Sequence, residues 1–214
     1  LGTLLTVLCC ALFGYILTKK ELPFRKIIYR YVVMTMYLNA GLIPTYILMK
    51  KIGLMNRFWI YIIPTAVSAY FLILIKTYIE QIPASLEESA MVDGANYFTV
   101  FSRIIFPICT PIIATVAVFT AVTQWNTFAD NLIYVSNPKL QTLQIILYKV
   151  LVNVKEATQS IRTQDLARNR FLVQPTPTTV RMTITMIATL PIIFVYPFLQ
   201  RYFVKGIMIG AVKG

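Results

Sequence analysis

Four charged side chains stand close together in the stretch EESAMVDGANYFTVFSRIIFPICTP, which begins at residue 87. They are Glu87, Glu88, Asp93 and Arg103. Paired carboxylates catalyse proton transfer when they face one another across a substrate. Glu88 and Asp93 are too close along one hairpin to form such a facing pair, and the chain contains no histidine. The residues alone therefore leave three interpretations: a connector between membrane spans, an interfacial amphipathic helix, and a weak catalytic cluster.

Helix signals surround these charges. Ser85 follows Pro83 and precedes Glu88 by three residues, which predicts a capping box with Ser85 as the N-cap and a helix that continues to Val92. We expect this first helix to lie outside the apolar runs of the chain.

A turn at Asp93-Gly94 is predicted to follow, with Gly94 at positive φ and Asp93 capping the next helix. The second helix is predicted over Ala95–Phe106, limited by Pro107. The expected result is a pair of short helices bent at a glycine and lying at a membrane surface.

The composition indicates the surroundings of this hairpin. The chain has 214 residues, of which 57% are hydrophobic and 13% charged, whereas soluble domains carry about 25% charged residues. We therefore predict an all-α, polytopic bundle, since only helices and closed barrels satisfy the backbone in lipid. The five expected spans are Leu1–Leu17, Ile27–Met49, Phe58–Ile79, Ile108–Trp125 and Val180–Leu199.

The domain organisation expected from this pattern is one transmembrane domain over residues 1–214. Residues 83–107 form the hairpin loop, and residues 126–179 form a long external segment with a helix candidate, LQTLQIILYKVL. Because Leu1 stands inside an apolar run, we expect the natural chain to have residues before it.

Charge supports a membrane protein more than a nucleic-acid partner. The formal net charge is +12, but the Lys and Arg residues lie between apolar runs rather than among stacking aromatics. Their distribution favours, weakly, a cytoplasmic hairpin and C-terminal tail. The three cysteines, Cys9, Cys10 and Cys109, lie in apolar stretches and are expected to be inert thiols, and no metal site is expected.

Nine hairpin residues form an ordered pattern: Glu88, Ser89, Ala90, Asp93, Gly94, Ala95, Phe101, Ile104 and Pro107. This pattern resembles the EAA loop of permease subunits in binding-protein-dependent ABC importers, with Ser89 in place of an alanine and Phe106 in place of a leucine. The stretches ALFGYILTKKELPFRK and YPFLQRYFVKGIMIGAVKG are similar to those of the carbohydrate-uptake branch. Permeases for oligogalacturonides and alginate are the most similar in character.

The resemblance implies partners and roles. The nine residues would form a coupling helix that docks on an ATP-binding subunit, with Glu88 pairing a basic group there and Gly94 allowing the bend. The other partners would be a second homologous permease, a second ATPase subunit and an extracytoplasmic solute-binding protein, in a bacterial inner membrane. ATP and Mg²⁺ would bind the ATPase subunits, because this chain has no G-x-x-x-x-G-K-[ST] sequence and no cofactor of its own is expected.

The tail carries Gly206, Gly210 and Gly214 at a GxxxG spacing, beside Lys205 and Lys213. The glycines can indicate a close-packed helix face, and the lysines a flexible tail outside lipid. The resemblance adds a third interpretation, which we favour: Lys205, Gly206, Gly210 and Lys213 reach the ATPase subunits.

Polar residues inside spans are candidates for the substrate path. These are Asn39, Gln124, Trp125 and Asn126, although interhelical hydrogen bonds explain each of them at least as well. The presumed outer segments hold nine Lys or Arg and three acidic residues, which suggests either an acidic, uronate-containing oligosaccharide or docking of an acidic binding protein.

Other functions remain as alternatives. A secondary transporter would often carry an acidic residue within a span, and none of the five spans has one. A membrane enzyme would need a catalytic constellation, which is not visible. An ABC permease for another small solute would share the hairpin but not this tail.

Overall fold

The computed structural model describes the backbone of residues 1–161 and 177–211 and the side chains of residues 1–154 and 178–195. This part of the chain is helical and contains no strand, which confirms the all-α class. The α-helices are α1 (Gly2–Ile16), α2 (Arg25–Tyr37), α3 (Leu42–Ile52), α4 (Ala69–Ile79), α5 (Ala84–Val92), α6 (Tyr97–Val100), α7 (Phe106–Ile108), α8 (Thr110–Asn126), α9 (Ala129–Tyr134), α10 (Leu143–Ile161) and α11 (Pro177–Ala211). The shorter helical turns are η1 (Phe58–Tyr61), η2 (Phe101–Ile105) and η3 (Pro138–Leu140).

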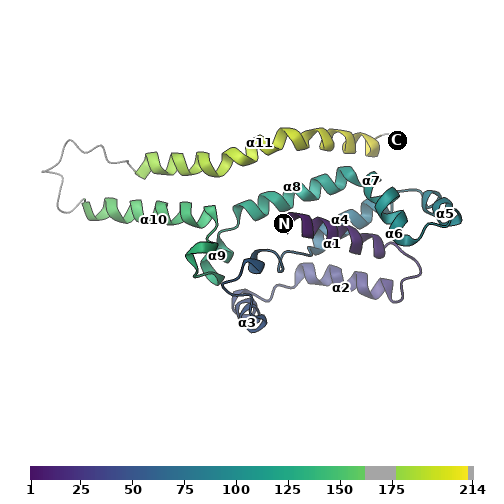
Figure 1. The fold of residues 1–214 in the computed structure, drawn as a ribbon, viewed down its shortest axis with the longest axis horizontal. Helices are drawn as coiled ribbons and strands as arrows, with labels where there is room; N and C mark the ends of the chain where they lie inside the picture. The colour runs from purple at the N-terminus through teal and green to yellow at the C-terminus, as the bar shows by residue number, and fades with distance from the viewer. Residues whose placement is uncertain (162–176, 212–214) are drawn as a thin grey trace.

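Helices α1, α4 and α8 pack together and form the main hydrophobic core (Figure 1). Ile75 and Cys10 are fully buried there. Gly14 lets α1 approach α4 closely, since a Cβ atom built on it would lie 3.3 Å from the Leu72 carbonyl oxygen and 3.4 Å from the Lys76 amide nitrogen. The three cysteines are unpaired, and Cys109 is buried in the same core.

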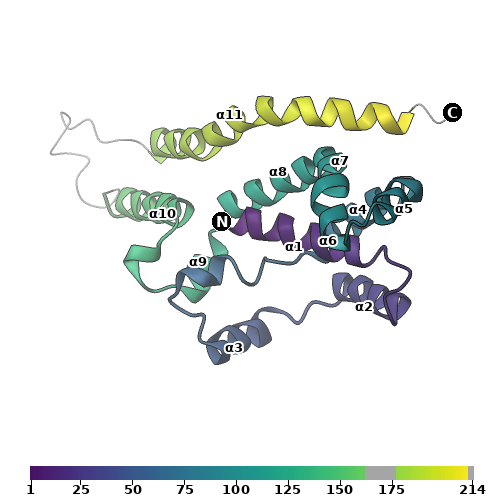
Figure 2. The ribbon, with the colours of Figure 1, turned by 45° about the vertical axis from the view of Figure 1, so that its right-hand side comes forward.

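Helix α11 lies along α8 and α10, outside this core (Figures 1 and 2). The indole Nε1 of Trp125 on α8 donates to the Ala188 carbonyl oxygen on α11 at 3.0 Å. The helix candidate in the long segment is confirmed as α10, although it begins at Leu143 and extends to Ile161.

The predicted spans are less regular than expected. Within the described residues, one helix has an apolar stretch long enough to cross a membrane, Thr178–Val195 in α11. Two pairs of consecutive helices are together long and apolar enough for a span, but each pair is bent at a short break. The bend is 117° between α2 and α3, and 78° between Tyr97–Ile108 and α8. Helices α1 and α4 are apolar but have only 15 and 11 residues.

The expected span Ile27–Met49 is divided into α2 and α3, which are bent by 117° to one another. The chain leaves the helix at Leu38, which is extended, and Gly41 has φ +81°. The Asn39 Oδ1 atom accepts a hydrogen bond from the Gly41 amide at 2.9 Å. This side-chain-to-backbone bond and the glycine end the helix despite the apolar composition around them.

The predicted span Phe58–Ile79 is also interrupted. It contains the single turn η1, then irregular backbone around Pro64, and becomes an α-helix only at Ala69. A proline removes a backbone donor and clashes with the preceding turn, so the helix starts after it. Pro44 and Pro111 stand in the first turns of α3 and α8, where no donor is required, shortly after the bends of 117° and 78°.

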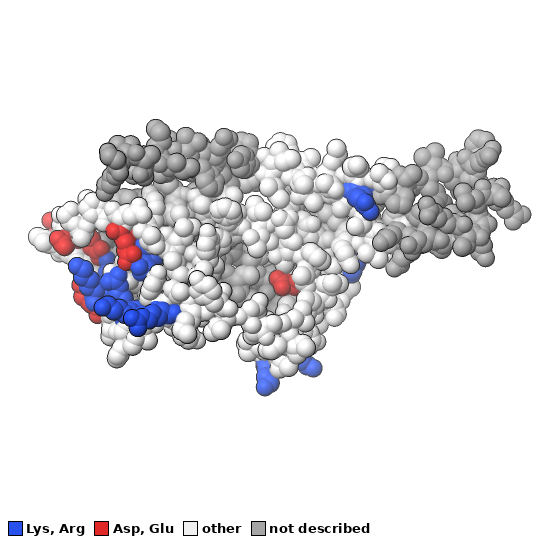
Figure 3. All heavy atoms as spheres, turned by 180° about the vertical axis from the view of Figure 1, so that it is seen from behind, with Lys and Arg blue, Asp and Glu red and all other residues white. Residues whose placement is uncertain are grey.

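Charged side chains gather at one end of the molecule. Figure 3 shows blue and red atoms concentrated there, and a broad belt with few charges beyond them. The ion pairs Lys19–Glu87, Arg25–Glu80 and Lys76–Glu80 belong to this end. The separation of charged end and apolar belt fits a bundle whose charged end lies at a membrane face.

Candidate coupling site

The hairpin consists of α5 and α6 joined by the turn Asp93–Asn96. Gly94 has φ +84°, as predicted. Its amide donates to the Met91 carbonyl oxygen at 3.0 Å, and the Ala95 amide donates to the Ala90 carbonyl oxygen at 2.9 Å. These two bonds form a Schellman motif, in which the residue after the helix must be left-handed. Gly94 therefore sets the bend between the two helices.

The capping predictions were wrong. Pro83 is the N-cap of α5, with no side-chain cap, so Ser85 already lies in the first turn and no capping box forms. Asp93 ends α5 and does not cap the next helix. Asn96 does so instead, with its Oδ1 atom accepting from the Thr99 amide at 2.8 Å. Asn96 is the residue directly before α6, and an N-cap side chain reaches the amide of the third helical residue, here Thr99.

The second helix also differs from the continuous Ala95–Phe106 that was expected. It runs as α6, then the π-helical turn η2, then α7, which ends at Ile108. The Phe106 amide bonds the Phe101 carbonyl oxygen in the wide register of a π-helix. Pro107 follows and has no amide hydrogen to donate, so the wide turn accommodates it and the helix continues one residue beyond it.

One face of the hairpin is fixed in the core and the other is exposed. Val100, Phe101 and Ile105 are buried, and the Phe101 ring lies 5.3 Å from the Tyr15 ring of α1. The tip is open, since Val92 is 87% exposed.

The nine residues of the predicted coupling set divide between these faces. The exposed ones are Glu88, Ser89, Asp93, Gly94 and Pro107; the half-buried ones are Ala90, Ala95 and Ile104; and Phe101 is buried. The structure thus brings the polar members together on the open face and places Phe101 among the anchoring residues.

A polar cluster that the sequence did not reveal holds the hairpin on α1. The Tyr15 hydroxyl donates to Glu87 Oε1 at 2.9 Å, and the Lys19 ammonium forms an ion pair with the same oxygen. The Lys19 nitrogen also lies 3.9 Å from the centroid of the Tyr15 ring. Lys19 lies beyond the end of α1, so its position beside Tyr15 and Glu87 depends on the turn that follows the helix. Charge-assisted bonds of this kind are stronger than neutral ones.

A second ionic cluster joins the neighbouring helix ends. Glu80, at the end of α4, pairs with Arg25 at 2.9 Å and with Lys76 at 2.7 Å. The Arg25 Nε atom also donates to the Leu17 carbonyl oxygen at 2.7 Å. The ends of α1 and α4 and the start of α2 are therefore linked beside the hairpin.

Within the described residues, no group of His, Cys, Asp and Glu side chains is placed to hold a metal ion. The exposed carboxylates are instead suited to pairing with basic groups of another protein.

A profile of the family described as "Binding-protein-dependent transport system inner membrane component" matches residues 11–209. The chain belongs to this family. The match begins within α1 and covers α4, α8, the hairpin and nearly all of α11, so it applies to most of the fold.

Two relatives match over the whole of this chain. The polygalacturonan/rhamnogalacturonan transport system permease protein YtcP of Bacillus subtilis (strain 168) is 36% identical over 214 residues, which are all of this chain and 73% of that protein. Protein LplC of the same strain is 37% identical over 213 residues, all of this chain and 70% of LplC. The likeness extends to a solved structure, a bacterial ABC transporter involved in the import of the acidic polysaccharide alginate. Its TM-score is 0.78 with 29% identity, over 94% of this chain and 71% of that one.

Membership places the permease among inner membrane components of ABC importers. Such transport systems combine a permease with ATP-binding subunits and a solute-binding protein. The family is one of transport proteins.

The permease does not gather its predicted substrate-path residues into one site. Asn39 is exposed at the break between α2 and α3. The Gln124 amide donates to Thr65 Oγ1 at 2.7 Å and joins α8 to the irregular segment before α4, whereas Trp125 bonds Ala188 and joins α8 to α11. Asn126, the last residue of α8, is exposed. The interhelical interpretation therefore accounts for Trp125 in this conformation.

The tail of the permease is helical further than expected. Helix α11 continues through Lys205, Gly206 and Gly210 to Ala211, so the flexible-tail interpretation does not hold for this backbone. The side chains at these positions and the whole of Lys213 lie outside the described residues. Contact of the tail with an ATPase stays a prediction.

A buried polar group that the sequence did not reveal fixes the segment after α8. The Asn131 side chain is almost fully buried and donates to the Tyr61 hydroxyl and, at 3.1 Å, to the Leu140 carbonyl oxygen. The Asn56 Oδ1 atom accepts from the Ser136 amide at 2.6 Å. These bonds hold the start of the long segment against the residues around η1.

Proposed function

We propose that this permease forms half of the translocation pathway for an oligosaccharide delivered by a solute-binding protein. The observation that carries the proposal is the match of this whole chain to the polygalacturonan/rhamnogalacturonan permease, together with the likeness to the alginate importer. Polygalacturonan and alginate are both polymers of uronic acids, so an acidic oligosaccharide is the cargo we favour.

The complete transporter, in this proposal, contains a second homologous permease and two ATPase subunits. ATP and Mg²⁺ bind the ATPase subunits, and this chain contributes no catalytic group. The hairpin over residues 83–107 docks on one ATPase through its exposed face, which carries Glu88, Ser89, Asp93 and Gly94. Phe101 supports the docked hairpin from the core side.

The bonds on the inner face of the hairpin support a transmission role. Glu87 is held by Tyr15 and Lys19 of the α1 end, and Val100 and Phe101 are buried in the core. A displacement of the docked hairpin is therefore passed to α1 and α4 as a rigid-body movement. Such movements of whole helices are how transporters alternate access between the two faces.

The charge of the presumed outer face supports an acidic cargo. The described basic residues there are all exposed: Lys50, Lys51, Arg57, Lys139 and Lys149. The sequence adds Lys155, Arg162, Arg168 and Arg170 to this group, and their side chains lie outside the described residues. Attraction of uronates and docking of an acidic binding protein both use such a surface.

Reconstitution with the partner subunits and the binding protein tests the function. We expect ATP-dependent uptake of oligogalacturonates into proteoliposomes, and weaker uptake of neutral oligosaccharides of equal length. Uptake of neither class would contradict oligosaccharide import, and equal uptake of both would remove the preference for acidic cargo.

A further inference from the structure

An open cleft of about 810 Å³ lies beside the start of α2, at the charged end of the molecule. Five cationic side chains line it, from the loop after α1, from α2 and from α4. They are Lys20, Arg25, Lys26, Arg30 and Lys76. No residue of the hairpin lines this cleft, although Lys20 and Arg25 also border smaller clefts beside Glu87.

The charges of the cleft are not balanced by the described residues. Glu80 neutralises part of the charge, because it pairs with both Arg25 and Lys76. Lys20, Lys26 and Arg30 have no carboxylate within 4 Å among the described side chains. Three unpaired cations around one cleft attract an anion with more than one acceptor oxygen.

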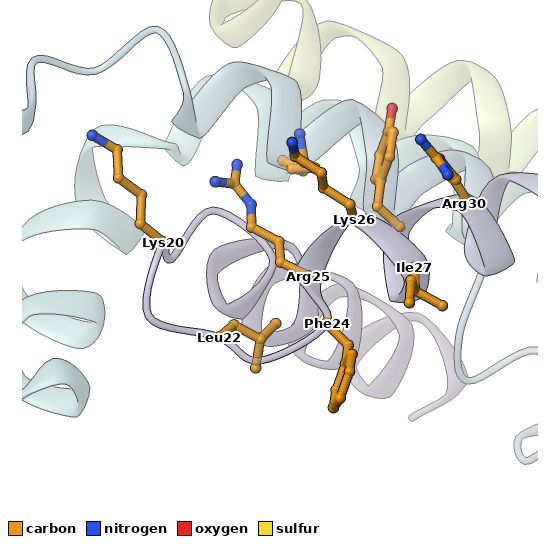
Figure 4. Close-up of a pocket in the computed structure, with 9 residues that line it drawn as sticks. Lys20, Leu22, Phe24, Arg25, Lys26, Ile27 and Arg30 are labelled. Atoms are coloured by element: carbon orange, nitrogen blue, oxygen red, sulfur yellow. The ribbon is translucent and has the colours of Figure 1, made fainter.

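An apolar surface borders the cations. Figure 4 shows the nitrogen ends of Lys20, Lys26 and Arg30 turned to one side of the α2 start, and Phe24 and Ile27 turned to the other. Phe24 directly precedes α2, has φ +56° and is 75% exposed.

The apolar surface continues along α2. Ile27, Tyr31 and Met34 are exposed at the spacing of one helix face. In the belt beyond the charged end, lipid chains can cover this face, whereas water would leave it unfavourably hydrated.

We propose that this cleft binds the headgroup of an anionic phospholipid, with the acyl chains along the exposed face of α2. Basic pockets beside membrane-spanning helices suit phosphodiester headgroups, and cations near an anionic surface each add to the attraction. A free phosphate would use the cations but not the apolar face. An acidic protein surface would likewise leave Tyr31 and Met34 uncovered.

Native mass spectrometry of the detergent-solubilised transporter, with its ATPase subunits, tests the proposal. Phosphatidylglycerol is titrated against phosphatidylcholine. The intact complex should retain phosphatidylglycerol preferentially. Lys26→Gln with Arg30→Gln should lower that affinity roughly 25-fold, from about fivefold for each cation. Lys26→Arg with Arg30→Lys should restore it, and Lys50→Gln with Lys51→Gln, which removes the same charge at the end of α3, should not change it.

Five results would overturn the proposal. Equal retention of both lipids, or no loss in the glutamine variant, would exclude headgroup recognition here. Displacement of the lipid by millimolar inorganic phosphate would indicate a free-anion site, and displacement by oligogalacturonate would indicate a cargo site. Loss of the ATPase subunits from the glutamine variant would assign the cations to a protein interface. None of these readouts depends on transport, so they are separable from failure of the proposed function.

Discussion

Two adjacent carboxylates in the hairpin have different surroundings, and this difference separates anchoring from docking. Glu87 accepts bonds from Tyr15 and Lys19 and is half-buried. Glu88 is exposed on the face that carries the open tip. The same chemical group therefore stabilises the hairpin at one position and is available to a partner at the next.

Glu87→Gln should lower the thermal stability of the complex, because it removes the ion pair with Lys19 and weakens the bond from Tyr15. The cost is about 2 kcal/mol, the range for a hydrogen bond to a charged group. Glu88→Gln is the matched control and should leave the unfolding temperature unchanged. Equal shifts for both variants in a thermal unfolding assay would show that Glu87 has no special anchoring role.

A pH-dependent effect is expected at Asp130 in α9, outside the membrane-spanning segments. Burial raises the pKa of its carboxyl above the ordinary value. A raised pKa in the folded state means that stability is lost as pH rises through it, because the charged form is disfavoured there. Asp130→Asn should therefore unfold at a higher temperature than the parent at pH 7, and this advantage should shrink as the pH falls towards about 4.

The control for this prediction is Asp93→Asn, where the carboxylate is exposed. A stabilisation of the same size from Asp93→Asn, or one from Asp130→Asn that does not vary with pH, would show that burial of Asp130 is not the cause.

At the scale of the elements, the bend between α5 and α6 depends on one backbone conformation. Gly94 has φ +84°, and no other atom lies within 4 Å of the position that a Cβ atom would take there. A side chain at this position therefore has space but not the right backbone preference. Any effect of substitution is a backbone effect rather than a clash.

Gly94→Val should cost about 1–2 kcal/mol in the hairpin, since a β-branched residue strongly disfavours this region. Coupling should fall while the bundle stays folded. Gly94→Asn, which tolerates left-handed backbone better, should retain most of the activity. The measurement is cargo-stimulated ATP hydrolysis in proteoliposomes, and full activity of Gly94→Val would mean that the bend is not needed.

The elements show what the sequence can predict. The bend at Gly94 was predictable because a single glycine satisfies a local rule. The cap at Asn96 and the break at Gly41 were missed because several Ser, Asp, Asn and Gly residues compete locally, and the final choice depends on packing. The Tyr15–Lys19–Glu87 cluster joins positions 72 residues apart, so its geometry follows from how α1 packs and not from any local pattern.

At the scale of the whole molecule, charge is separated along the bundle. The hairpin and the ionic clusters lie at one end, and exposed lysines such as Lys50 and Lys139 lie in segments assigned to the opposite face. The composition alone predicted a membrane bundle, because soluble domains carry about twice the fraction of charged residues. The breaks within the spans could not be predicted from composition.

Reversal of charge on the presumed outer face separates its two explanations. With the binding protein loaded with acidic or neutral oligosaccharides of equal length, we expect Arg162→Glu, Arg168→Glu and Arg170→Glu together to reduce ATPase stimulation more for the acidic cargo. An equal reduction for both cargoes would favour docking of the binding protein. Salt screens both effects over about 10 Å at 0.1 M and does not distinguish them.

The most direct test of coupling through the hairpin is Glu88→Lys in the assembled transporter, measured by co-purification of the ATPase subunits and by cargo-stimulated ATP hydrolysis. Glu21→Lys makes the same charge change at an exposed position on the same end, outside the hairpin. We predict that Glu88→Lys weakens ATPase retention and abolishes stimulation, while Glu21→Lys leaves both near the parent values. Normal retention and stimulation in Glu88→Lys would contradict a coupling role for this hairpin.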